Sequence, residues 1–370
     1  MRVLVLTNMY PRADRPTFGI FVKEQIEDLE RLGCTVDLRV VRGDTSKLNY
    51  GRAAAAVRRI VRDGEYDVLH AHYGLTGAVA VAQREVPVVV TFHGSDCNGD
   101  APWQTAVSWC VARVSLPIFV SPLLAEGLGL PRAPVIPAAV DAERFTPIPQ
   151  AEARARLGLS ETGTYVLLPG SRKELRKRAD LFDEALAHAR TKRPGIEGLS
   201  MENLSRDDVA LTMNAVDAVL MTSNYEGSPV AVKEALACCT PVVSVPVADV
   251  PSLIEGLPGC GVAPREGRVL GERLLEAIDT GRSDALRERV LPFARRPMAL
   301  AVMRVFEAAA DERPRRVTRR AVGGGGGRPP RTPSSCGAPR GASVRRRRTP
   351  RRPPRRRGAL SPPACLARSP

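Results

Sequence analysis

Short apolar runs rich in valine, isoleucine and leucine alternate along the chain with longer segments that mix apolar and polar residues. Strands of a parallel sheet have this appearance because helices cover both of its faces. The first 145 residues contain six such runs with helical segments between them, which predicts one doubly wound domain. The expected strands are 3–6, 36–41, 68–70, 86–92, 118–121 and 135–136, and the expected helices are 19–32, 52–63, 75–83, 106–113 and 123–128.

A run with two prolines between Val140 and Pro149 interrupts this alternation, which starts again at residue 151. We therefore place the first domain at 1–145 and a second α/β domain at 146–297. The expected helices of the second domain are 151–157, 181–190, 207–215 and 230–238, the expected strands are 165–168, 218–221 and 241–245, and further helices follow between 268 and 310.

Composition changes this picture mainly at the carboxyl end. The 370 residues carry 55 Lys and Arg against 40 Asp and Glu, a net charge of +15 that ordinarily suggests nucleic acid or an anionic membrane as a partner. Residues 313–370 alone contain 18 arginines and no lysine or acidic residue, which leaves 37 basic and 40 acidic residues in the body. The body therefore lacks the basic balance of a nucleic-acid-binding protein, and no specific nucleic acid partner is expected.

The segment 313–370 also contains 11 prolines and a run of glycines, so it is expected to be a disordered tail. Three interpretations of this tail stay open: a tether to an anionic membrane, a linker, and a non-native end produced by a shifted reading frame. The abrupt loss of lysine and of acidic residues favours the last of them.

Cysteine usage and hydropathy bear on location. The six cysteines of the body form no C-x-x-C pair and no Cys/His cluster at metal spacing, so no zinc site is expected. No apolar run reaches the roughly 18 residues of a membrane span, and the apolar start is too short for a signal peptide. We predict a cytoplasmic protein. Basic residues around Ala53–Val57 indicate either a solvated helix face or peripheral contact with an anionic membrane on its inner face.

The stretch from Asn224 to Ala237 carries the strongest chemical signal, because it follows a strand and opens a helix. Ser228 is a natural N-cap and Pro229 a natural first helical residue. The free N–H groups of such a helix start, together with its dipole, form an anion site that suits phosphate. Glu234 lies about 7.5 Å from the helix start, within reach of a ribose whose phosphates lie there. An ordinary capped helix with solvated glutamates is the alternative.

Two further segments end predicted strands. The basic turn from Pro169 to Arg178 offers the clustered cations that a diphosphate leaving group needs, or is a solvated turn. His93 ends an apolar strand at the carboxyl edge of the sheet, where open α/β folds bind ligands, although a single histidine is more often structural. The G-x-G-x-x-G fingerprint of dinucleotide-binding proteins is absent.

Taken in order, these motifs resemble those of the retaining glycosyltransferases of family 4, whose GT-B fold has two Rossmann-like domains with a cleft between them. The marks are the E-x7-E spacing with Pro241-Val242-Val243, the glycine turn, the strand-end histidine and a glycine loop near the N-terminus. The resemblance covers residues 1 to about 310. It implies a catalytic pair of Glu226 and His93, a donor site of Arg172, Lys177, Gly227, Ser228, Pro229, Val230 and Glu234, and an acceptor side of Gly19 and Asp96.

The resemblance also implies an activity. A hexosyl group would pass with retention from a UDP- or GDP-type sugar nucleotide to a saccharide or lipid-linked acceptor, in cell-envelope polysaccharide or glycolipid synthesis, with no cofactor and no metal. The final helix, 298–312, would cross back to the first domain. The chain departs from the family at Ala138-Ala139, where Asn-Gly is usual. A sugar-nucleotide epimerase of the same fold and an inactive copy stay open as alternatives.

Overall fold

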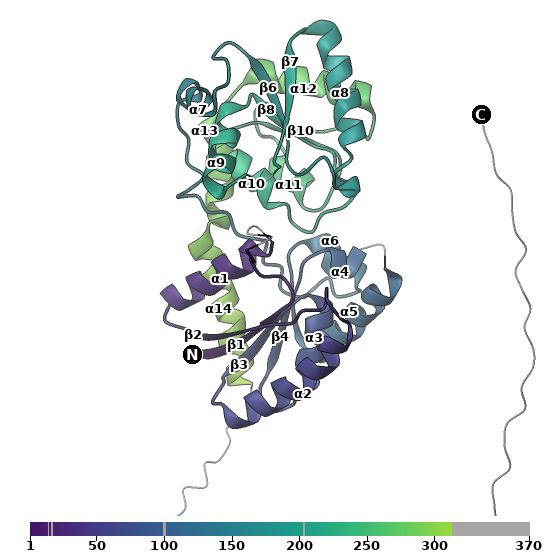
Figure 1. Cartoon of the computed structure of the whole chain (residues 1–370), viewed down its shortest axis with the longest axis vertical. Helices are drawn as coiled ribbons and strands as arrows, with labels where there is room; N and C mark the ends of the chain where they lie inside the picture. Colours follow the sequence, from purple (N-terminus) through teal and green to yellow (C-terminus); the bar gives the residue numbers. More distant parts are fainter. Residues whose placement is uncertain (14, 16–17, 99–100, 203, 313–370) are drawn as a thin grey trace, which may run out of the picture. The chain divides into compact units, whose positions relative to one another are not determined.

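The computed structural model describes residues 1–312 except 14, 16–17, 99–100 and 203 (Figure 1). The first half is built on a five-stranded sheet with the order β2-β1-β3-β4-β5, in which every neighbouring pair is parallel. Its strands are fully or partly apolar runs, as expected for a sheet that helices cover. They are β1 (Arg2–Thr7), β2 (Thr35–Val40), β3 (Val68–His72), β4 (Val88–Phe92) and β5 (Leu116–Phe119).

Helices fill the connections of this first sheet. They are α1 (Ile20–Arg31), α2 (Leu48–Asp63), α3 (Gly74–Ala80), α4 (Ser95–Asn98), α5 (Pro102–Val114) and α6 (Pro122–Gly127). The short helix α4 was not predicted. The sixth strand predicted at 135–136 is wrong: Val135 forms only an isolated bridge with Phe119. Prolines at 134 and 137 bracket this pair of residues, and proline removes the N–H that a longer ladder needs.

The second half holds another five-stranded parallel sheet, with the order β10-β9-β8-β6-β7. Its strands are β6 (Thr164–Leu168), β7 (Ile196–Ser200), β8 (Ala218–Met221), β9 (Val242–Ser244) and β10 (Gly261–Val262). Helical elements between and after them are α7 (Gln150–Leu157), η1 (Leu175–Lys177), α8 (Ala179–Lys192), α9 (Arg206–Ala215), α10 (Val230–Ala237), α11 (Val250–Ile254), α12 (Gly267–Thr280), α13 (Asp284–Val290) and η2 (Leu291–Phe293).

Two strands of the second sheet, β7 and β10, were not predicted, and both lie at its edges. β7 has the sequence IEGLS with two exposed residues, and β10 has two residues. Edge strands need little apolar sequence because one side stays open, so neither gives a clear hydrophobic signal.

The last helix, α14 (Arg295–Asp311), returns to the first half, and Figure 1 shows it beside α1 and the first sheet. Its residues Val302, Phe306 and Ala309 are buried in the same apolar cluster as Val3 and Val22. The two chain crossings between the halves are joined, because the N–H of Val140 donates to Phe293 O at 3.0 Å and the N–H of Arg295 donates to Val140 O at 3.1 Å. Both halves belong to one compact unit.

The helices bear on the prediction that the chain contains no membrane span. Over the described residues, no helix combines the length and the apolar character that crossing a bilayer requires. The predictions made for the arginine-rich tail, 313–370, lie outside the described residues.

Candidate functional site

A pocket of about 380 Å³ lies where loops of the two halves meet, and we call it the reaction pocket. This volume is in the range of small-molecule sites. The loops follow the carboxyl ends of strands in both sheets, which is where open α/β folds place their ligands. The lining residues of the reaction pocket are Met9, Phe21, His93, Ser95, Val120 and Ala138 from the first half, and Arg176 and Tyr225–Val230 from the second.

Glu226 is held by two cations on the second-half side of this pocket. Its Oε1 lies 2.7 Å from Lys177 Nζ and 2.7 Å from Arg176 Nη1. Burial by itself would raise the pKa of Glu226, but the charges of Lys177 and Arg176 outweigh burial and hold the pKa below its ordinary value. Glu226 is therefore an anion at neutral pH, and it carries its charge into the reaction pocket.

The backbone fixes these two cations in place. The 3-10 turn η1 ends at Lys177, and its carbonyl groups are tied to the loop after β8: Thr222 Oγ1 donates to Lys177 O at 2.7 Å, and the N–H of Asn224 donates to Arg176 O at 2.8 Å. Lys177 is 7% exposed, and its side chain lies against Gly170, where a Cβ atom would approach the lysine Cε to 2.6 Å. A glycine at 170 thus makes room for the lysine.

The structure does not bring Arg172 to the reaction pocket. Its guanidinium forms an ion pair with Asp183 on α8, and the backbone N–H of Arg172 donates to Glu202 Oε1 at 3.1 Å. Arg176, four residues later, lines the pocket in its place. The sequence offered five cations in this turn, and spacing alone did not separate them.

The start of α10 also differs from its prediction. The helix begins at Val230, and the Ser228 side chain does not cap it. Instead the Ser228 hydroxyl donates to Asp249 Oδ2 at 2.6 Å and accepts from Lys233 Nζ at 2.5 Å. Lys233 is fully buried, and burial lowers the pKa of its ammonium group although Asp249 opposes the shift. These hydrogen bonds of Ser228 to Asp249 and Lys233 hold the loop Gly227–Val230 in place while it lines the pocket.

Glu234 is 2% exposed and does not line the reaction pocket. Its Oε1 lies 2.7 Å from Arg206 Nη1, and the same arginine lies 3.6 Å from Glu24 of α1. Burial raises the pKa of Glu234, with Arg206 opposing. A ribose that bonded to Glu234 would take the place of Arg206, so this role of Glu234 stays a prediction.

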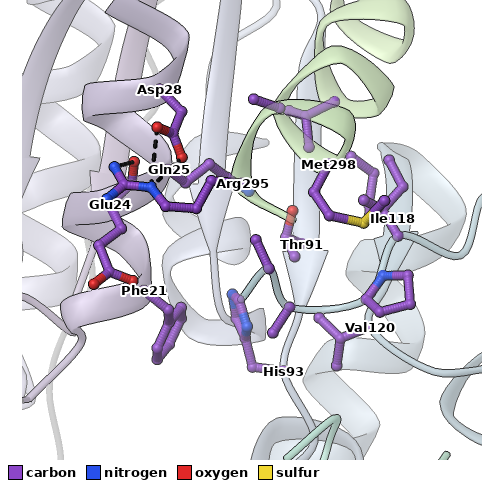
Figure 2. Close-up of a pocket in the computed structure, with 16 residues that line it drawn as sticks. Phe21, Glu24, Gln25, Asp28, Thr91, His93, Ile118, Val120, Arg295 and Met298 are labelled. Atoms are coloured by element: carbon purple, nitrogen blue, oxygen red, sulfur yellow. Dashed lines mark hydrogen bonds and ion pairs between the residues drawn. The ribbon is translucent and has the colours of Figure 1, made fainter. Parts of the chain in front are cut away.

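His93 forms the wall of the reaction pocket on the first-half side. Its Nε2 lies 3.0 Å from Nδ1 of the buried His72, and its ring lies 4.8 Å from that of Phe21. His93 and Phe21 also line a smaller cavity of about 30 Å³, together with Glu24 and Arg295 (Figure 2). Burial lowers the pKa of His93 to about 3, so the ring is neutral at pH 7. One ring nitrogen then donates a hydrogen bond and the other accepts one.

Asp96 is completely buried and organises the loop that carries His93. Its Oδ1 accepts from the N–H groups of His93 at 3.0 Å and Gly94 at 2.9 Å, and its Oδ2 accepts from the N–H of Gly74 at 3.0 Å. A fully buried carboxylate is not exposed to an acceptor. The structure thus gives the Asp96 side chain a positioning role, and Ser95 beside it lines the pocket.

Replacing Asp96 by asparagine is expected to lower the free energy of unfolding by about 3 kcal/mol, because an amide NH2 would face backbone N–H groups that then have no acceptor. Urea unfolding of the full chain measures this loss. Asp183→Asn, at a carboxylate that is 54% exposed, is the control and should change stability by less than about 0.5 kcal/mol. Equal effects of the two substitutions would contradict the positioning role.

Glycines allow the two halves to approach each other here. A Cβ atom at Gly94, where φ is 120°, would lie 2.7 Å from Gly227 Cα, and a Cβ atom at Gly227 would overlap the carbonyl of His93. Gly19, with φ of 68°, precedes α1, and a Cβ atom there would lie 2.7 Å from the N of Tyr10. Gly19 thus packs against the loop that places Met9 in the pocket, and the loops of His93 and Glu226 touch directly.

Four residues of this region were not predicted as part of the site: Arg176, Arg206, Lys233 and His72. Lys233 had a sequence signal, since it is a lysine in an otherwise apolar helical run. The contact of His72 with His93 depends on the pairing of β3 with β4, which local sequence does not indicate. Over the described residues, no three His, Cys, Asp or Glu side chains gather in a way that would hold a metal ion. That the reaction needs no metal stays a prediction.

Comparison with known families agrees with this arrangement. Residues 1–139 match the family described as "Glycosyl transferase 4-like domain", and residues 165–280 match "Glycosyl transferases group 1". The two matches cover both sheets and all the loops that line the reaction pocket. The chain belongs to glycosyltransferase family 4 and has the GT-B fold.

Relatives with related functions differ in substrate. The chain is 25% identical to the "Putative teichuronic acid biosynthesis glycosyltransferase TuaC" of Bacillus subtilis (strain 168) over 346 residues, 74% of this chain and 88% of the relative. It is 30% identical to the "D-inositol 3-phosphate glycosyltransferase" of Mycobacterium sp. (strain JLS) over 243 residues, 53% of this chain. The latter match spans 55% of that relative's length.

Solved structures share the fold. Sucrose-phosphate synthase from Thermosynechococcus elongatus superimposes with a TM-score of 0.70 at 18% identity, covering 83% of this chain and 99% of the other. The Anabaena protein HepE, solved in complex with UDP, has a TM-score of 0.64 at 17% identity, covering 83% and 100%. At these identities the likeness establishes the GT-B fold, which was the fold predicted from the sequence.

Proposed function

We propose that this protein is a retaining glycosyltransferase that moves a hexosyl group from a nucleoside-diphosphate sugar to a saccharide or lipid-linked acceptor, without a metal. The observation that carries the proposal is the reaction pocket, where the anionic Glu226, two cations and the loop before α10 lie opposite His93. The HepE structures, whose titles name UDP and UDP-glucose, support a sugar-nucleotide donor.

In this proposal the bond between the sugar and the diphosphate breaks while a bond to the acceptor oxygen forms, and the proton of the acceptor hydroxyl passes to the departing diphosphate. Negative charge then grows on the diphosphate, and Lys177 and Arg176 lie where they offset it. Both cations pair with Glu226 in the present structure, so a bound diphosphate would share them with that carboxylate. Positive charge develops on the sugar ring, and the carboxylate of Glu226 stabilises it.

The acceptor loops belong to the first half and include Met9 and Ser95. We place the reaction on the cytoplasmic side, in the synthesis of a cell-envelope polysaccharide or glycolipid, with peripheral contact to the inner face of the membrane. TuaC, named for teichuronic acid biosynthesis, supports the polysaccharide role.

A thermal-shift experiment on the full chain tests the donor. We expect one of UDP, GDP, ADP and CDP, or its sugar conjugate, to raise the melting temperature, since ligand at 100 times its Kd stabilises by about 2.7 kcal/mol. Glu234→Ala should abolish that shift if Glu234 bonds the ribose. The control is Glu202→Ala, at a carboxylate outside the pocket that pairs with Lys173. No shift with any nucleotide would contradict the function, and a sugar nucleotide epimerised without acceptor would identify an epimerase instead.

A further inference from the structure

An apolar groove of about 510 Å³ lies in the first half between helices α2, α3 and α5, and the proposed reaction does not use it. Trp103, one of its walls, is 52% exposed, which is unusual for so large an apolar side chain. We call it the helix groove. Its lining residues are Lys47, Tyr50, Ala54, Leu75, Ala78, Val79, Trp103 and Val107.

The helix groove opens at the same edge of the sheet as the reaction pocket. Tyr50, Leu75 and Trp103 each lie within the first three residues of a helix, and α2 and α3 directly follow strands of the first sheet. The starts of such helices lie at the carboxyl edge of a parallel sheet. The groove therefore begins beside the acceptor loops and runs away from them along the helices.

Hydrogen bonds connect the groove to the pocket at two points. Asn8 Nδ2 donates to the hydroxyl of Tyr50 at 3.2 Å, and the next residue, Met9, lines the reaction pocket. On the other side, the N–H of Gly74, which precedes Leu75, donates to Asp96, which follows the pocket residue Ser95. Residues that adjoin the lining of the reaction pocket are thus hydrogen-bonded to a residue that lines the helix groove and to one that adjoins it.

Charge at the groove defines what kind of molecule fits. Lys47 is the one cation among the residues that line the groove, and α2 carries Arg52, Arg58, Arg59 and Arg62 outside this lining, against one acidic residue, Asp63. An apolar groove lined by one ammonium group is complementary to an aliphatic chain that ends in phosphate.

We propose that the helix groove binds the aliphatic chain of a lipid-phosphate-linked acceptor, with Lys47 at the phosphate and the acceptor sugar in the reaction pocket. The proposal rests on the proposed function, of which it selects the lipid-linked acceptor. It separates this chain from enzymes that glycosylate a small soluble acceptor, for which an apolar groove beside the pocket has no use.

Tryptophan fluorescence of the full chain tests this binding, because the two tryptophans of the chain are Trp103 and Trp109. In Trp109→Phe, Trp103 is the single reporter, and dodecyl phosphate with bromine at its chain end should quench it saturably below the micelle concentration. In Trp103→Phe, the remaining Trp109 lies outside the groove lining and should not be quenched. Equal quenching of both reporters, or quenching only by anionic brominated vesicles, would overturn the proposal.

A matched pair of substitutions on α2 locates the site. Ala54 lines the groove, whereas Ala55 is exposed and does not. Ala54→Glu, made in the Trp109→Phe chain, should weaken binding of the brominated probe about tenfold or more, because a carboxylate is costly beside an alkyl chain. Ala55→Glu has the same charge and the same helix, and it should stay within about twofold. If Ala54→Glu has a lowered melting temperature, Leu75→Gln provides a second variant of the groove lining. Equal effects of Ala54→Glu and Ala55→Glu would overturn the proposal.

The nucleotide thermal shift, run on the same preparations, separates the two proposals. A nucleotide shift without quenching by the alkyl phosphate overturns the groove inference alone. Quenching without any nucleotide shift contradicts the glycosyltransferase proposal. The alkyl chain bound in the groove could then no longer be assigned to a glycosyl acceptor. Both signals together, with Ala54→Glu losing only the alkyl phosphate, are the expected result.

Discussion

Glu226→Gln is expected to lower the turnover of glycosyl transfer by a factor of about 100 to 1,000 while leaving donor affinity nearly unchanged. Glutamine keeps the size of the side chain and an oxygen that accepts from Lys177, so the pocket keeps its shape. It removes the negative charge that, in the proposed reaction, stabilises the positive charge developing on the sugar ring. Initial rates at saturating donor, together with calorimetric titration of the nucleotide, separate the two effects.

The control for this substitution is Glu174→Gln, because Glu174 also pairs with Arg176, at 2.8 Å, but is 46% exposed. We expect a change of less than about twofold there, as for most exposed ion pairs. Full turnover in Glu226→Gln with donor still bound would remove Glu226 from the chemistry.

The pH dependence of turnover is expected to follow the ionisation of Glu226. Because Lys177 and Arg176 hold the pKa of Glu226 below its ordinary value, the folded enzyme keeps this carboxylate ionised under mildly acidic conditions. Activity that depends on ionised Glu226 should therefore not fall between pH 7 and about pH 5, and its loss should begin only below the ordinary pKa of a glutamate, about 4.3. In Lys177→Met the acid limb should move upward, since burial is then opposed by one cation fewer. Turnover measured against pH checks both.

Lys177→Met is expected to weaken binding of the nucleoside diphosphate about a hundredfold. The lysine is nearly buried beside Glu226, and in the proposed reaction its Nζ offsets the charge of the leaving diphosphate, for which water cannot easily substitute at a buried position. Methionine fills a similar volume against Gly170 and removes only the charge. Calorimetric titration with the nucleotide that gives the thermal shift measures the loss.

Arg172→Met is the matched control in the same turn. Its guanidinium is 39% exposed and paired with Asp183, so we expect less than a twofold change in nucleotide affinity. A hundredfold loss of nucleotide affinity in Arg172→Met, with near-normal affinity in Lys177→Met, would assign the diphosphate contact to Arg172. It would contradict the assignment of that contact to Lys177.

The hydrophobic pattern was enough to predict two parallel α/β domains, because buried parallel strands are apolar along their whole length. The GT-B fold was predicted from the resemblance of the motifs to those of family 4. The two strands that it missed, β7 and β10, are edge strands with weak hydrophobic signals. The false strand at 135–136 had the apolar residues of a strand but too few backbone donors around it.

The site was predictable by segment and less so by side chain. Glu226, Lys177 and His93 come from the segments that the sequence selected, and all three lie at or beside the reaction pocket. Arg172 and Glu234 come from selected segments too, but their ion pairs with Asp183 and Arg206 turn them elsewhere. Such pairs join residues 11 and 28 positions apart, and only the folded backbone decides which partner a charged side chain meets.

The return of α14 to the first sheet has a consequence for the order in which the protein is made. Val302, Phe306 and Ala309 complete an apolar cluster that begins with Val3 and Val5. A ribosome that has released only the first 145 residues has produced every strand of that sheet but not the helix that covers part of it. Part of the apolar face of the amino-terminal half therefore stays uncovered until about 160 further residues have been synthesised. At 5 to 20 residues per second, that interval is roughly 10 to 30 seconds. During this time the apolar face of the nascent chain is exposed to aggregation, and the last helix ends that exposure when it packs there.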